Sequence, residues 1–121
     1  MIVARPACDL EAALRSLEGD SDLLNEMALI FLEESVKMKA AIHEGVESGD
    51  ANALMRSAHN IKGSVANFAA EGARSAAHQL EMIGRSGDLI EVPAKYEAFL
   101  KEIEVVEAEL RRYVKVLPAL E

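Results

Sequence analysis

The sequence contains no tryptophan and one cysteine, and aromatic residues make up only 4% of its 121 residues. A single cysteine excludes an intramolecular disulfide and any cysteine-rich zinc or iron–sulfur site. Because half of the residues are hydrophobic and few of these are aromatic, the core is expected to be aliphatic, as is typical of helical bundles. We interpret Cys8 as a small apolar core residue of a protein from a reducing compartment.

Long apolar runs and an excess of positive charge are also absent. No run approaches the roughly 18 residues of a membrane helix, and the chain does not begin like a signal peptide. Thirteen Lys and Arg against 21 Asp and Glu give a net charge of −8, which argues against binding nucleic acid or an anionic membrane. We therefore expect one cytoplasmic domain that spans residues 1–121.

Apolar residues recur every three or four positions in five segments, and no segment shows the alternation of a β-strand. The segments cover about residues 9–17, 22–48, 51–68, 71–85 and 93–117. Gly19 and Gly49 are expected to end the first two, and Gly84 and Gly87 to mark the end of the fourth. Short turns favour antiparallel neighbours, so the predicted fold is all-α: an antiparallel up-and-down four-helix bundle preceded by a short N-terminal helix.

The third segment carries the most informative residues. Its apolar stripe runs through Ala58, Ile61, Val65 and Phe68. His59 lies about 100° from this stripe, and Lys62 and Gly63 follow at the spacing that shares its face. Glycine inside a helix costs about 1 kcal/mol relative to alanine, and the close approach of another molecule's backbone would compensate.

This pattern favours a phosphate-accepting histidine. Neutral imidazole is a competent nucleophile near pH 7, and phosphoryl transfer chiefly needs positive charge near the moving oxygens. Lys62 would supply that charge, and Gly63 would clear space for the partner. The short pattern is equally compatible with an ordinary half-exposed histidine beside a solvated lysine.

The longer run from Ala58 to Ala70 resembles the signature of histidine-containing phosphotransfer (HPt) domains, roughly A-H-x-L-K-G-S-x-A-N-x-G. The resemblance extends as a motif over about residues 9–90. Two positions depart from it: Ile61 replaces a leucine, and Ala69 stands where the family usually has glycine. A left-handed backbone at Ala69 would cost about 1 kcal/mol, so the turn after the third helix is where a departure from the family is expected.

The resemblance implies a phosphocarrier in a multistep His-Asp phosphorelay. His59 would accept a phosphoryl group from the aspartate of one response-regulator receiver domain and pass it to another receiver. Lys62 would steady the phosphoryl group, and Gly63 would let the partner dock closely. Glu81 would accept a hydrogen bond from Nδ1 of His59, which leaves Nε2 as the nucleophile and stabilises the cationic ring.

Further residues would frame this site. Met55 and Ala66 are expected to form an apolar docking patch, and Arg85 would add positive charge beside it. Ser64 would hydrogen-bond either the phosphoryl group or a carbonyl of its own helix.

No cofactor is expected on the chain, because the receiver would bring its own Mg²⁺. No nucleotide-binding motif is present, so we expect a phosphotransfer intermediate and not a self-sufficient kinase. The partners would be receiver domains, including that of a hybrid histidine kinase, and the protein is expected to be a monomer.

Two alternatives belong to other functional classes. A non-catalytic helical module could bind a receiver or another partner through the same surface without being phosphorylated. A metal-binding bundle is disfavoured, because the paired Glu-x-x-His motifs of di-iron bundles are absent. His43 and His78 are accordingly interpreted as partly exposed surface histidines.

Overall fold

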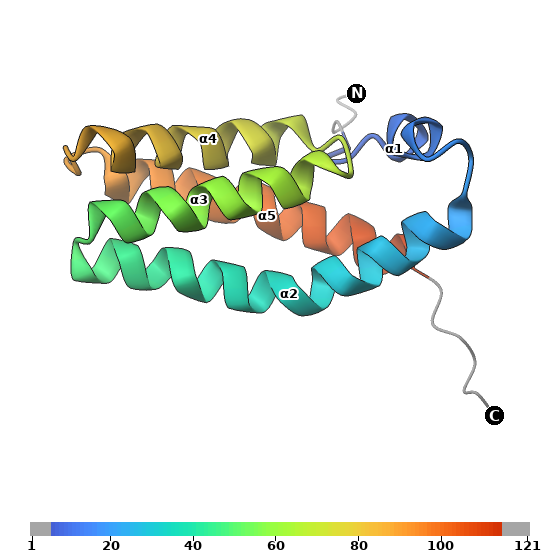
Figure 1. The fold of residues 1–121 in the computed structure, drawn as a ribbon, viewed down its shortest axis with the longest axis horizontal. Coiled ribbons are helices and arrows are strands. Elements are labelled where there is room, and N and C mark those ends of the chain that lie inside the picture. The colour runs from blue at the N-terminus through green and yellow to red at the C-terminus, as the bar shows by residue number, and fades with distance from the viewer. Residues whose placement is uncertain (1–5, 115–121) are drawn as a thin grey trace, which may run out of the picture.

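The computed structural model describes residues 6–114. Its five helices are α1 (Leu10–Ser16), α2 (Ser21–Ser48), α3 (Ala51–Ala66), α4 (Glu71–Ser86) and α5 (Val92–Tyr113). Helices α2 to α5 run up and down along a common direction, and α1 lies at one end of the bundle (Figure 1). No strand occurs between residues 6 and 114, so the predicted all-α bundle with a short first helix is confirmed.

Local side-chain chemistry sets most helix ends. The N-caps of α1, α2 and α3 are aspartates whose carboxylates each accept a hydrogen bond of 3.0 Å from a backbone amide three residues later. Gly49 and Gly87 end α2 and α4 in the left-handed conformation, at φ 68° and 79°. The expected extension of the last helix to Leu117 lies outside the described residues.

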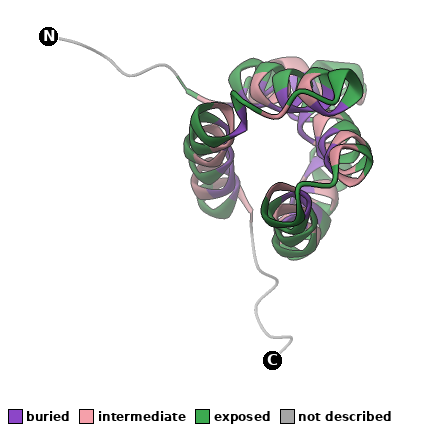
Figure 2. Ribbon diagram, turned by 90° about the vertical axis from the view of Figure 1, so that its left-hand side faces the viewer, coloured by how far each residue is buried: buried purple, intermediate pink, exposed green. Residues whose placement is uncertain are grey.

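The core is aliphatic with a few aromatic side chains, as the composition predicts. The buried faces of the helices point toward a common centre (Figure 2). Its largest fully buried side chains are Phe68, Phe99, Leu24, Ile42, Leu54, Ile61, Leu80, Ile103 and Leu110. Cys8 is buried at the edge of this core, where burial and the neighbouring Glu109 carboxylate raise its pKa to about 12. Its thiol is therefore an inert packing group, as expected.

Gly84 allows α3 and α4 to pack unusually closely. A Cβ atom at this position would lie 2.7 Å from the carbonyl oxygen of Ala51 and 2.8 Å from the backbone nitrogen of Met55. Gly87 ends α4 as predicted, whereas Gly84 lies inside the helix and is buried. Its role is contact between the two helices, and any larger side chain would push them apart.

The turn from α3 to α4 contains the residue at which a departure from the family was expected. Helix α3 ends at Ala66, two residues earlier than predicted, and Ala69 adopts the left-handed conformation at φ 50°. An alanine here carries the steric cost that glycine avoids. The turn is therefore left-handed at Ala69 in spite of this steric cost.

Replacing Ala69 with glycine should stabilise the domain by about 1 kcal/mol, because the strain of the left-handed alanine is removed. Urea unfolding monitored by circular dichroism measures this change. Ala66→Gly is the matched control, since Ala66 is helical and exposed and its replacement should destabilise by a similar amount. A loss of stability in Ala69→Gly would contradict the strain argument.

Candidate functional site

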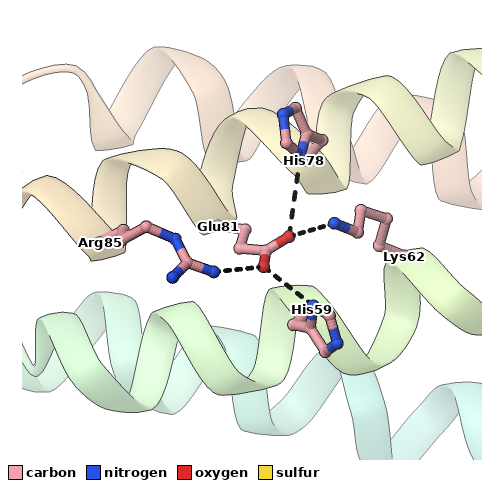
Figure 3. A network of polar contacts seen from close by, with 5 residues as sticks. All are labelled: His59, Lys62, His78, Glu81 and Arg85. Carbon is pink, nitrogen blue, oxygen red and sulfur yellow. Dashed lines mark hydrogen bonds and ion pairs between the residues drawn. The ribbon is translucent and has the colours of Figure 1, made fainter.

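A buried carboxylate on α4 is the centre of a polar cluster between α3 and α4 (Figure 3). The Glu81 side chain is 3% exposed. Its Oε2 accepts hydrogen bonds from Nδ1 of His59 at 2.9 Å and from Nη2 of Arg85 at 3.0 Å. Nζ of Lys62 lies 2.6 Å from Oε1, and Nδ1 of His78 lies 3.8 Å from the same oxygen. Two permanent cations thus face one anion, which makes the cluster locally positive in an acidic domain.

The His59 ring is held at one nitrogen and open at the other. Its side chain is 66% exposed, and Nδ1 faces the carboxylate while the second ring nitrogen points away from it (Figure 3). With the Nδ1 proton donated to Glu81, the lone pair of Nε2 remains free and accessible. The carboxylate thus orients the ring, and the other ring nitrogen is the one that a partner molecule can reach.

The packing of α3 against α4 explains how these groups meet. Gly84 is one turn beyond Glu81, and the backbone that it approaches at Met55 is one turn before His59. Close contact at that level brings the next turns of both helices, and therefore the imidazole and the carboxylate, within hydrogen-bond distance. The left-handed turn at Ala69 leaves this pairing intact, since the distance between Nδ1 and Oε2 is 2.9 Å.

The electrostatics of the cluster keep Glu81 ionised. Contact with the Lys62 ammonium, opposed by burial and reinforced by His59 and Arg85, lowers the pKa of Glu81 from 4.5 to about 2. The two oxygens differ in their partners. Oε2 accepts two hydrogen bonds, whereas Oε1 has the Lys62 ion pair but no hydrogen bond of normal geometry from any residue between 6 and 114.

Acid should remove the stability that ionised Glu81 contributes. Because its pKa is lower in the folded than in the unfolded chain, this contribution is complete above about pH 4.5 and is lost as the pH falls toward 2. Urea unfolding of the wild type and of Glu81→Gln should show a free-energy difference that narrows below about pH 4.5. A difference that stays constant down to pH 2 would contradict the assigned ionisation.

Gly63 is exposed on α3, and the packing of the domain does not explain it. Outside its own helix and chain neighbours, no atom of the described residues lies within 4 Å of the position that a Cβ would occupy. A glycine here forgoes about 1 kcal/mol of helix stability without relieving any internal clash. A glycine at this position is therefore expected to serve contact with another molecule that approaches this face.

Three further predicted residues, Met55, Ala66 and Ser64, lie on α3 and do not contact the Glu81 carboxylate. Met55 is half-buried beside Gly84, and Ala66 is exposed in the last turn of α3. Ser64 faces α2: its Oγ donates to the carbonyl of Asn60 at 3.4 Å and lies 3.7 Å from Sδ of Met38. Of the two roles considered for Ser64, the structure shows the bond to its own helix.

His78 and Gly84 are the residues whose place in the site the sequence did not reveal. His78 is half-exposed, as expected of a surface histidine, but its ring also faces the Glu81 carboxylate (Figure 3). The only signal in the sequence is its spacing, three positions before Glu81 on one helix. Residues 6–114 contain no group of three or more His, Cys, Asp or Glu side chains arranged to hold a metal ion.

The hydropathy of the helices adds one further observation. Within the described part of the chain, no helix has the length and apolar character that crossing a membrane requires.

Comparison with known proteins gives a family and a structural relative. A family model described as Hpt domain matches residues 26–109. The fold is similar to the crystal structure of histidine-containing phosphotransfer protein B (HptB) from Pseudomonas aeruginosa PAO1, with a TM-score of 0.81 and 26% sequence identity. The match covers 90% of this chain and 95% of that one. Comparison with curated protein sequences finds no significant match.

Proposed function

This chain belongs to the Hpt domain family, and from that premise we propose that it is a phosphocarrier whose phosphoryl group is held on His59. The observation that carries the proposal is the contact between Nδ1 of His59 and Oε2 of Glu81 at 2.9 Å. It fixes the tautomer in which Nε2 is the nucleophile and leaves that nitrogen open to a partner.

The proposed transfer needs no cofactor on this chain, because every bond that forms is matched by one that breaks. Nε2 of His59 attacks the phosphorus of an aspartyl phosphate on a receiver domain, so the N–P bond forms and the P–O bond to the aspartate breaks. The aspartate leaves as a carboxylate, and the ring becomes a phospho-imidazolium that keeps its Nδ1 proton. Buried, ionised Glu81 stabilises this cation. In the second half of the relay, an aspartate of another receiver attacks the phosphorus and the neutral ring departs.

The surroundings of His59 suit an incoming phosphoryl group. Lys62 and Arg85 give the cluster a net positive charge beside the nucleophile. Gly63 leaves room for the backbone of a receiver, with Met55 and Ala66 offering apolar contacts nearby. We infer that the receiver brings its own Mg²⁺ and docks transiently.

Labelling with purified, phosphorylated receiver domains tests the proposal. The wild type should acquire a phosphate that is labile in acid and stable in base, as expected of a phosphoramidate on histidine. If a receiver binds the protein but never labels it, the non-catalytic interaction module is correct and the phosphocarrier is not. We propose a cytoplasmic monomer, so mixtures with a receiver should contain a one-to-one complex.

A further inference from the structure

Lys62 has two incompatible tasks in the proposed function. In the structure its ammonium lies 2.6 Å from the buried Oε1 of Glu81. To steady a phosphoryl group on Nε2 of His59, on the side of the ring away from the carboxylate, it must turn from Oε1. A buried charged oxygen that loses its partner is costly, so another donor must replace Lys62.

Among residues 6–114, one further group lies near Oε1 and can replace Lys62. Oε2 already accepts hydrogen bonds from His59 and Arg85, whereas Oε1 accepts none of normal geometry from the described residues. Nδ1 of His78 lies 3.8 Å from Oε1, about 1 Å beyond hydrogen-bond distance. Its half-exposed ring has room to close that gap by a small change of rotamer.

We propose that His78 is a positioning residue. It replaces Lys62 as the hydrogen-bond donor to Oε1 of Glu81 when Lys62 turns to the phosphoryl group. The inference rests on the proposed function, which it deepens by assigning an exchange of partners at one carboxylate oxygen. His78 acts through Glu81 and Lys62 and does not itself touch the reacting atoms.

The surrounding charges favour the exchange in the phosphorylated state. His78 faces Glu81, whose other partners are Arg85 on the same helix and Lys62 and His59 on α3. On its other side it lines a surface groove with three charged residues, namely Asp88, Glu91 and Lys95.

Before transfer, the two cations and one carboxylate of the cluster sum to +1, a net charge that would repel a cationic His78 ring. A phosphoryl dianion on a cationic His59 ring brings that sum to zero. The electrostatic repulsion of a cationic His78 ring therefore disappears, and the ring can bind Oε1 as a cation.

Phosphorylation by a small donor tests the exchange without a partner protein. Phosphoramidate transfers its phosphoryl group to Nε2 of His59: the new N–P bond forms, the donor's P–N bond breaks, and the protonated nitrogen leaves as ammonia. We expect His78→Ala to slow formation of phospho-His59 about tenfold, since Lys62 must then leave Oε1 unpaired. The matched control is Gln79→Ala, an exposed neighbour on α4 that is not among the partners of the Glu81 carboxylate.

The pH profile separates a proton-dependent exchange from a merely structural role. Acid slows both proteins because it protonates the imidazole nucleophile, but below neutral pH the ratio of the wild-type rate to the His78→Ala rate should rise. His78→Lys carries a permanent cation, so it should restore the rate and show no such rise. In a Lys62→Ala background, His78→Ala should have no additional effect, because there is no ion pair to exchange.

Nitrogen-15 NMR of the wild type provides a direct readout. At pH 7 the fraction of His78 that carries protons on both ring nitrogens should rise when His59 is phosphorylated. Absence of labelling in the wild type would overturn the phosphocarrier function itself. If the wild type is labelled, but His78→Ala matches it in rate and pH profile and the His78 spectrum does not change, the exchange is overturned and the phosphocarrier stands.

Discussion

Replacing His59 with glutamine is expected to abolish phosphate acceptance and leave the fold intact. Glutamine has no nucleophilic ring nitrogen, and no other described histidine combines an oriented Nδ1 with an open, glycine-flanked face. The His59 side chain is 66% exposed, so its replacement removes little packing. Labelling by phosphorylated receivers should fall to background, while circular dichroism shows unchanged helicity.

His43→Gln is the matched control for this substitution. His43 is an exposed histidine on α2 whose Nδ1 lies 3.0 Å from the hydroxyl of Tyr96, away from the Glu81 cluster. It should be labelled at the wild-type rate. If His59→Gln still accepts phosphate from a receiver, the phosphoryl group is carried elsewhere and the assignment of His59 is wrong.

Replacing Gly63 with glutamine is expected to block transfer from receivers while sparing phosphorylation by small donors. No atom outside its own helix and chain neighbours approaches within 4 Å of the Cβ position, so the new side chain projects outward and should not disturb the fold. It would hold a docked receiver away from Nε2 of His59. A misplacement of about 1 Å costs about a hundredfold in rate, and glutamine displaces the partner by more.

Two comparisons test this prediction: labelling by a small phosphoryl donor against labelling by a receiver, and Gly63→Ala against Gly63→Gln. Phosphoramidate is small enough to reach Nε2 past the glutamine, so its labelling rate should stay near that of the wild type. Gly63→Ala should stabilise the helix by about 1 kcal/mol and slow receiver transfer less than glutamine does. Equal receiver rates in wild type and Gly63→Gln would show that no close approach occurs at this face.

The fold was largely predictable because its determinants are local. Aspartate caps, left-handed glycines and a period of three to four residues depend on neighbours within a few positions, and with them all five helix starts are predicted to within one residue. The early end of α3 was the main difference. There the apolar stripe continues to Phe68, which is buried from the turn and not from the helix.

In the candidate site, too, the residues of one helix could be predicted from local geometry, whereas the contact between two helices could not. The common face of His59, Lys62 and Gly63 follows from helical geometry alone, since all three belong to one helix. The resemblance to HPt domains then pointed to Glu81, which lies 22 positions further along the chain. That the two residues meet was an expectation, because the left-handed alanine at position 69 stood between their helices.

The sequence by itself determined an acidic, aliphatic five-helix domain with one histidine, one lysine and one glycine on a common helical face. Only the tertiary structure decided which oxygen of Glu81 each cation contacts, that Gly84 sets the approach of α3 to α4, and that His78 faces the same carboxylate. The physical reason is distance. Local patterns repeat every few residues, whereas a carboxylate shared by two helices depends on interhelical spacing to within an ångström.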